Sequence, residues 1–402
     1  MRGPGLVNSR RVRRVAGRGF VSERGATALR RGARAAIGLV ALAACARAPG
    51  VFSQRLGPYD IYAGSTAGRL SPAVRGDPQR VYVPNLGSDD VTVIDPKSFR
   101  AVDRFSVGHA PQHVVPSWDL RTLWVTGSAD GGRPGSLTAI DPATGRPTCQ
   151  IAVDDAYNMY FTPDGGSAIV VAEQRRTLEF RDPHTMALQF ELPTPGCNGV
   201  NHADFAPDYS YAIFTCEFDA SLVKIDLKRR QVAGYLHLSR RGMPQDIRSS
   251  PDGKVFFVAN MITDGVSLID GEAFREIGFI HTGIGAHGLY PSRNGRRLYV
   301  ANRGSHLVTG PPRGPGSISV IDFASRKVVE TWPIPGGGSP DMGNVSADGK
   351  TLWLSGRFDD VAYAIDTRTG AVRKIPVGHT PHGLTVWPQP GTHSLGHTGV
   401  MR

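Results

Sequence analysis

The sequence predicts an all-β, seven-bladed β-propeller, and three observations lead to that fold class. First, an alternating apolar stretch that ends in Asp recurs at spacings of 41 to 52 residues. Second, each interval has room for four short strands, which is the content of one propeller blade. Third, the last repeat stops after one strand, whereas the first repeat begins with its second strand. The seven stretches end at Asp95, Asp141, Asp182, Asp226, Asp270, Asp322 and Asp366.

Each repeat follows one pattern, which is clearest in the fifth copy. An inner strand, "DIRSS", leads through the turn "PDG" into a second strand, "KVFFVAN". The Asp-ended strand "VSLID" comes third, and "REIGFIHTG" comes fourth. Alternation at every second residue favours strands, and the Asp-Pro and Asp-Gly pairs favour tight turns. With 49 Gly, 30 Pro and no sustained helical period, the chain is expected to consist of strands and turns.

The two ends of the repeat region are expected to share one blade. Before Asp95 stand only "RVYVPN" (80–85) and "VTVID", so the first blade lacks an inner strand. The last apolar stretch, "HGLTVWP" (382–388), opens a repeat that does not continue. We expect this C-terminal strand to complete the first blade, which closes the ring and removes its open sheet edges.

The residues before the repeats have the form of an export signal. Residues 1–45 contain ten Arg and one Glu, and the apolar stretch 35–44 leads to Cys45. A basic segment followed by a short apolar run and small residues is typical of a secretory signal. The apolar stretch is too short for a bilayer-spanning helix, which would need ~20 apolar residues. "LAAC" (42–45) resembles the lipobox of bacterial lipoproteins, which implies a lipidated Cys45; an ordinary cleaved signal is the alternative.

We therefore predict four segments and a cell-envelope location. They are a signal with a lipobox (1–45), a linker or strap (46–77), the propeller (78–391) and a C-terminal tail (392–402). The protein would be exported and attached to the membrane through its lipid. The leader carries +9 of the net charge of +11, which leaves +2 for the mature chain. Binding to nucleic acid therefore lacks electrostatic support and is not expected.

The strand motifs resemble a known family of propellers. "VYVPN", "VFFVAN" and "LYVANR", each followed by a "VxVID"-like strand and then "VG…P", are similar to the YVTN-type surface-layer β-propellers of secreted bacterial and archaeal proteins. The resemblance covers about residues 78 to 390. It implies a seven-bladed ring in an extracytoplasmic protein, and it implies no reaction, because a fold does not determine a function.

The start of each inner strand is expected to face the central channel. Aligning the repeats on "SPDG" places polar residues at these starts, and a ring brings them to one mouth of the channel. The longer loops 126–135 and 303–316 are expected on the same face, which is typical of a binding face. The predicted ligand-binding residues are His113, Asn158, His202, Asp246, His287, Asp341 and His382.

These residue types suit a metal ion, and two interpretations stay open. Imidazole and carboxylate are usual ligands of transition metals, and imidazole also ligates haem. A divalent metal or haem is thus a candidate cofactor, with His113, His202, His287 and His382 as the metal ligands. Alternatively, the residues are the polar lining of a water-filled channel, because a ring of seven spreads its members too widely for all to reach one ion at ~2.0–2.2 Å.

Two functions follow, and we prefer the first. It is a non-catalytic binding or scaffolding module whose mouth takes an envelope protein or a small polar ligand. The second is a metal- or haem-assisted enzyme, either an oxidoreductase or a lactonase, since propeller lactonases hold divalent metals in their channels. No GxSxG, HExxH or P-loop motif is present, which favours the first function.

The cysteines add one open question. Cys197 and Cys216 are either a disulfide or small buried apolar residues, because the distance between them decides and the sequence does not supply it.

Overall fold

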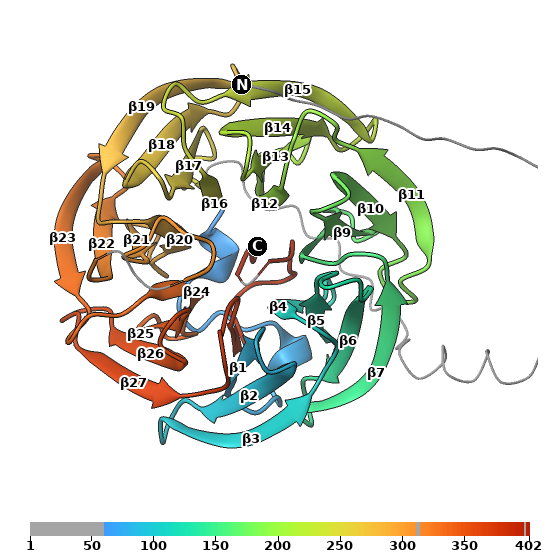
Figure 1. Ribbon diagram of the computed structural model, residues 1–402, viewed down its shortest axis with the longest axis vertical. Coiled ribbons are helices and arrows are strands. Elements are labelled where there is room, and N and C mark those ends of the chain that lie inside the picture. Colours follow the sequence, from blue (N-terminus) through green and yellow to red (C-terminus); the bar gives the residue numbers. More distant parts are fainter. Residues whose placement is uncertain (1–59, 311–313, 398) are drawn as a thin grey trace, which may run out of the picture.

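Seven four-stranded antiparallel sheets form a closed ring around a central channel (Figure 1). The computed structural model describes residues 60–310, 314–397 and 399–402. The predicted fold class is confirmed. The predicted signal, with Cys45, and part of the predicted linker lie outside the described residues.

The first four blades follow the chain from its N-terminal side. Blade 1 contains β28 (Thr385–Trp387), β1 (Arg80–Asn85), β2 (Asp90–Asp95) and β3 (Arg100–Ser106). Blade 2 contains β4 (Pro111–Pro116), β5 (Leu123–Gly127), β6 (Gly135–Asp141) and β7 (Arg146–Val153). Blade 3 contains β8 (Asn158–Phe161), β9 (Ala168–Ala172), β10 (Thr177–Arg181) and β11 (Leu188–Pro193). Blade 4 contains β12 (Val200–Phe205), β13 (Tyr211–Cys216), β14 (Ser221–Asp226) and β15 (Gln231–His237).

Three further blades complete the ring. Blade 5 contains β16 (Pro244–Ser249), β17 (Val255–Asn260), β18 (Gly265–Asp270) and β19 (Arg275–His281). Blade 6 contains β20 (Ala286–Pro291), β21 (Arg297–Asn302), β22 (Ser317–Asp322) and β23 (Lys327–Pro333). Blade 7 contains β24 (Pro340–Val345), β25 (Thr351–Gly356), β26 (Val361–Asp366) and β27 (Val372–Pro376).

The recurring Asp at the end of each third strand has a local structural role. In blades 4 to 7 its carboxylate accepts a hydrogen bond from the backbone N–H three residues further on, which forms the turn to the outer strand. These turns join a buried third strand to an outer strand whose residues are mostly exposed or half-buried. The core lies between neighbouring sheets, where apolar side chains of the three inner strands pack against those of the next blade.

The C-terminal strand closes the ring, as the sequence predicts. β28 pairs antiparallel with β1 through Arg80 with Trp387, Val81 with Val386 and Tyr82 with Thr385. Blade 1 therefore takes its inner strand from one end of the repeat region and its other three strands from the opposite end.

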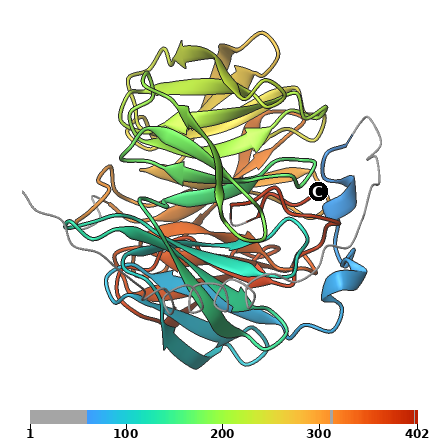
Figure 2. The ribbon, with the colours of Figure 1, turned by 90° about the vertical axis from the view of Figure 1, so that its right-hand side faces the viewer.

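The two ends of the channel differ. One end, here called the mouth, lies where inner strands begin and second strands end, as the pairing of Pro244 with Asn260 shows. Segments near both termini cover the opposite end (Figure 2), where the 3-10 helices η1 (Ala63–Ser65) and η2 (Pro72–Val74) lie. In that region the N–H of Ile61 bonds to the carbonyl of Pro251, in a turn between an inner and a second strand. Within the described ranges, no helix has the length and apolar character to span a membrane.

Candidate functional site in the central channel

All seven predicted ligand-binding residues lie at or just before the start of an inner strand and are buried. None of them is more than 2 % exposed. Six lie on six different inner strands, and His382 lies just before β28, where its backbone N–H donates to the carbonyl of Pro84. The repeat register was therefore read correctly, and the structure then sorts these residues into two groups.

The first group is a cluster of three histidines from three distant parts of the chain. His113 on β4, His202 on β12 and His397 in the C-terminal tail each offer a ring nitrogen, and these atoms lie within 4.8 Å of one another. The ring centroids are 4.7 Å apart for His202 and His397, 5.1 Å for His113 and His397, and 5.4 Å for His113 and His202. We call these three residues the histidine cluster.

The tail places His397, which the sequence analysis did not find. Ser394 is bridged to Met401, so the tail turns back on itself, and the carboxyl end of the chain lies near the channel axis (Figure 1). The N–H of His397 donates to the carbonyl of Met159 at 2.8 Å. Gly396 is required beside it, because its φ is +105° and a Cβ there would lie 2.3 Å from the Cα of Tyr160.

The tail is also anchored at its end. The guanidinium of Arg402 donates to the buried carboxylate of Asp204 at 2.6 Å, and both side chains are at most 2 % exposed. Leu395, Val400 and Met401 are buried as well. The segment outside the repeats is therefore part of the packed interior of the ring.

The histidine cluster contains unpartnered nitrogens. Neither ring nitrogen of His113, nor Nε2 of His202, has a hydrogen-bond partner among the described residues. Burial lowers the pKa of both imidazoles well below 6.5, so both rings are neutral at pH 7. Gly383 makes room for the ring of His113, since a Cβ on that residue would lie 1.9 Å from Nδ1. Buried nitrogens without partners carry a desolvation cost that a bound ion would remove.

Asn158 sets the tautomers of the other two histidines. Its Oδ1 accepts from the N–H of Met159 at 2.8 Å, which orients the amide. Its Nδ2 lies 3.1 Å from Nδ1 of both His202 and His397, so it donates to those atoms. In the neutral rings without an ion the proton is then on Nε2, and ligation through Nε2 of His202 would require that proton to move to Nδ1. On the other side, Nε2 of His397 lies 3.6 Å from the carboxylate of Asp246, which also pairs with Arg248 at 2.8 Å.

The second group is centred on Asp341. Its carboxylate accepts from Arg303 at 2.7 and 3.1 Å, lies 2.9 Å from Nδ1 of His287, and lies 2.7 Å from Nδ1 of His382. Arg303 and the two imidazoles hold the pKa of this carboxyl well below its usual range despite its burial. Burial also lowers the pKa of His382 to about 3. The four histidines predicted as metal ligands are thus split: His113 and His202 join the cluster, while His287 and His382 bind Asp341.

Charged residues missed in the sequence surround the mouth. In each blade the residue after the second strand lies at this end of the channel, next to the start of the inner strand. Blades 3 and 4 carry Glu173 and Glu217 at this position, and blades 6 and 7 carry Arg303 and Arg357. Aligning the repeats on their second strands would have revealed this rim in "VAEQ", "TCEF", "ANRG" and "SGRF".

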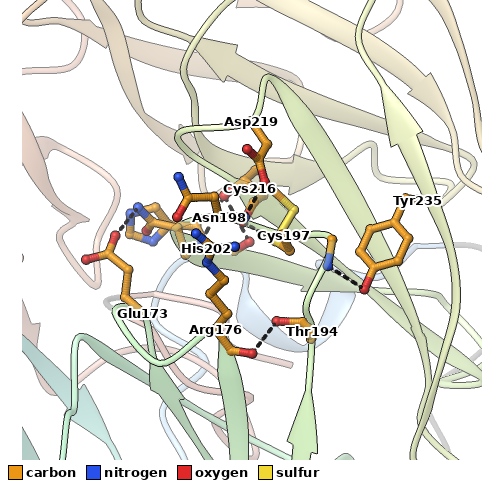
Figure 3. The surroundings of a disulfide bond; sticks show 12 residues. Glu173, Arg176, Thr194, Cys197, Asn198, His202, Cys216, Asp219 and Tyr235 are labelled. Atoms are coloured by element: carbon orange, nitrogen blue, oxygen red, sulfur yellow. Dashed lines mark hydrogen bonds between the residues drawn. A yellow bond between two sulfur atoms is a disulfide. The ribbon is translucent and has the colours of Figure 1, made fainter.

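A disulfide supports the acidic side of the rim. Cys197 and Cys216 are bonded, with Cα atoms 4.9 Å apart (Figure 3). The bond ties the loop before β12 to the end of β13, beside Glu173 and His202. The structure thus answers the question that the sequence left open.

Comparisons with known proteins agree with the fold. The model of the YNCE-like beta-propeller family matches residues 71–390. No curated protein matches the chain. Among solved structures, dihydro-heme d1 dehydrogenase NirN in complex with DHE is 17 % identical, with a TM-score of 0.58 over 84 % of this chain and 83 % of that one.

Two further solved structures have the same architecture. A candidate 6-phosphogluconolactonase from Bacteroides uniformis is 16 % identical, with a TM-score of 0.61 over 77 % of this chain and 99 % of that one. Hydrazine synthase from Kuenenia stuttgartiensis is 19 % identical, with a TM-score of 0.55 over 72 % and 96 %. Identities this low show a shared fold alone. The family model, in contrast, spans most of the sequence, and the chain belongs to the YNCE-like β-propeller family.

Proposed function

We propose that this protein is an exported binding propeller that holds one late transition-metal ion, copper or zinc, in its channel and receives a small polar ligand at the mouth. The observation that carries the metal is the histidine cluster, where unpartnered ring nitrogens of His113 and His202 lie beside His397. Neutral imidazole is the form that ligates metals, and burial keeps these rings neutral.

The chemistry and spacing of the donors favour a single ion. Three imidazoles suit copper or zinc better than magnesium or calcium, which prefer oxygen ligands. A bound ion would draw the three nitrogens somewhat closer, since zinc–nitrogen bonds are about 2.0–2.1 Å long. A haem fits this packing less well. His113 contacts Tyr157, His202, His382 and His397 at ring-centroid distances of 4.8 to 5.4 Å, and a macrocycle would have to displace those rings.

Elemental analysis of the purified mature protein tests the metal. We expect about one copper or zinc ion per chain after dialysis against metal-loaded buffer. The double variant His202→Gln, His397→Gln should lose it, because glutamine keeps a hydrogen-bonding side chain but is a poor ligand for these ions. His237→Gln, at an exposed position on β15, is the matched control and should retain the ion. Equal metal in the control and the double variant would reject the site.

Asn158 offers a second test of the same site. Ligation through Nε2 of His202 needs the proton on Nδ1, and an acceptor must then face that Nδ1. Asn158→Asp supplies a carboxylate at that place, so we expect metal affinity to rise by about 10–100-fold. Asn158→Leu, which has no acceptor, should not strengthen binding. A competition titration against a chelator measures both variants, and equal affinities in the two would contradict this role for Asn158.

The location outside the cytoplasm and the lipid anchor are part of the proposal. The buried Cys197–Cys216 disulfide supports export, because disulfides form and persist in oxidising compartments. Membrane attachment is expected to depend on Cys45 through multiple acylation, since one acyl chain binds a bilayer only marginally. The Cys45→Ala variant should therefore be recovered in the soluble fraction or remain unprocessed. Unchanged membrane partitioning of that variant would exclude the lipid anchor.

A metal-assisted enzyme, a lactonase or an oxidoreductase, is a second candidate. One observation favours it: burial and the neighbouring Glu217 raise the pKa of Glu173 well above its usual range. A protonated carboxyl at the mouth can act as a general acid. Lactone hydrolysis by the metal-loaded protein, lost in both Glu173→Gln and the double histidine variant, would move the assignment to a lactonase. An inactive metal-loaded protein leaves the binding function in place.

A further inference from the structure

We propose that the mouth binds a small zwitterion, an amino-carboxylate, with its carboxylate on Arg357 and its ammonium group at Glu173 and Glu217. This inference rests on the proposed ligand-binding role of the mouth, names the class of ligand, and does not depend on the metal. It stands on the arrangement of the rim residues and on their hydrogen-bond partners.

Arg357 is a buried cation whose partners are incomplete. It follows β25, and its backbone N–H donates to the carbonyl of Ser339 at 3.0 Å, which places it beside the start of β24 at the mouth. The side chain is only 6 % exposed, yet its Nε and Nη1 have no hydrogen-bond partner among the described residues. Nε and Nη1 lie on different edges of the guanidinium, so each of the two edges that can hold a carboxylate has a free donor.

The nearby carboxylates are already engaged by other groups. Asp341 is held by Arg303, His287 and His382. Glu217 accepts from the amides of Asn201 at 2.6 Å and Gln245 at 2.9 Å. Asp341 and Glu217 therefore already have partners, whereas donors of Arg357 remain available to an external anion.

Glu173 and Glu217 form the opposite pole. They lie on adjacent blades, across the ring from Arg357 on blade 7 (Figure 1). Asn201 contacts both, with its Nδ2 at 3.4 Å from Glu173 and 2.6 Å from Glu217. Burial and the charge of Glu217 raise the pKa of Glu173 well above its usual range, which favours the protonated form of Glu173. An ammonium group donates to several oxygens at once and relieves the repulsion between two carboxylates.

Charge balance favours a ligand that carries both signs. Arg303 offsets Asp341 in a direct ion pair, and Arg357 balances the glutamate pair only across the mouth. Tyr157 lies just before β8 at the mouth, where its hydroxyl is 3.3 Å from Nε2 of His382. A simple anion would leave the mouth with an excess negative charge, and a simple cation would leave Arg357 without a partner. A zwitterion serves both poles and keeps the mouth neutral.

The test compares matched probes by isothermal titration calorimetry on the mature protein. The probes are glycine, 4-aminobutyrate and 6-aminohexanoate, each beside the carboxylate and the amine of the same length. We expect one zwitterion to bind at least about tenfold more tightly than its matched carboxylate and amine, and its length reports the separation of the poles. Arg357→Gln should lower that affinity by about tenfold or more, whereas Arg100→Gln, exposed on β3, should not.

Further readouts separate folding, metal and ligand. Without ligand, Arg357→Gln should melt at a higher temperature than the wild type, because it removes an incompletely partnered buried cation. Arg357→Lys keeps the charge without the fork and should bind with intermediate affinity. Both Arg357 variants should contain as much metal as the wild type. If the wild type itself holds no metal, the histidine site is rejected and this inference is unaffected. Binding of no probe, equal binding of zwitterion and carboxylate, or undiminished binding by Arg357→Gln would each overturn it.

Discussion

Removing residues 379–402 is expected to prevent the protein from folding into a soluble ring. This deletion removes β28 and the tail, and it leaves β1 with an unpaired edge in a sheet that no longer closes. It also removes six buried apolar side chains, each worth about 1.5–3 kcal/mol. The loss matches or exceeds the roughly 5–15 kcal/mol by which a typical domain is stable. The six are Leu384, Val386, Trp387, Leu395, Val400 and Met401.

A shorter deletion separates ring closure from the tail. Removing residues 392–402 keeps β28 but removes three of those side chains and leaves the buried carboxylate of Asp204 without Arg402. We expect a closed but strongly destabilised ring that has lost His397. Soluble yield and urea unfolding of both deletions are measured beside the full chain and beside the exposed substitution Thr392→Ala. A soluble, cooperatively unfolding protein without residues 379–402 would contradict the closure of blade 1.

The metal-free protein is expected to lose stability steeply as pH falls below about 6.5. Burial lowers the pKa of five channel histidines in the folded state, and their unfolded pKa is about 6.5. Below that value the unfolded chain binds protons that the folded chain does not, so stability falls with pH. Each histidine contributes up to about 1.4 kcal/mol per pH unit, so the five together contribute a slope of up to ~7 kcal/mol per pH unit. The loss continues toward the folded values, about 3 for the pKa of His382.

Two carboxyl groups modify this profile. The pKa of Asp341 is lowered, so its stabilising contribution is present above its unfolded value, near 3.8, and is lost below it, which adds to the acid loss. The pKa of Glu173 is raised, so its contribution is present below its unfolded value, near 4.5, and is lost as pH rises through the folded value. Between pH 6.5 and 5, the loss of stability caused by the five histidines exceeds the effect of these two carboxyl groups on stability.

Urea unfolding at several pH values measures the slope. The double variant His202→Gln, His397→Gln should show a smaller pH dependence by about one third, whatever its stability at pH 7. Burial also lowers the pKa of His393, to about 4, so two of six histidine proton-binding differences are gone. Saturating zinc should reduce the acid loss in the wild type until protons displace the metal. Stability that is flat between pH 6.5 and 5 would mean that the channel histidines are not buried and neutral.

The sequence was sufficient for the fold because a propeller repeats its local rules. Strand alternation and the Asp turns recur seven times, and the unequal first and last copies allow a single way of closing the ring. The same alignment found the channel positions from His113 to His382, since register places one residue of every inner strand at an equivalent point. Local pattern and global topology agree in this chain, which is why the prediction succeeded.

The contacts within the channel could not be predicted in the same way. Which residues meet depends on side-chain direction and on partners that no spacing encodes. Asp341 pairs with His287 and His382 and not with His113 or His202. His397 lies outside the repeats, so no alignment of repeats includes it. Its position follows from the path of the tail between Gly391 and Arg402, which depends on contacts with Tyr160 and Asp204 far away in the chain.

Anomalous diffraction from crystals of the metal-loaded protein tests the central claim most directly. Data collected at the copper or zinc edge should show one strong peak in the channel, within about 2.0–2.1 Å of one ring nitrogen each of His113, His202 and His397. The same peak should be absent from crystals of the double variant His202→Gln, His397→Gln. A channel without a peak, or a peak held by His287 and His382 instead, would contradict the account.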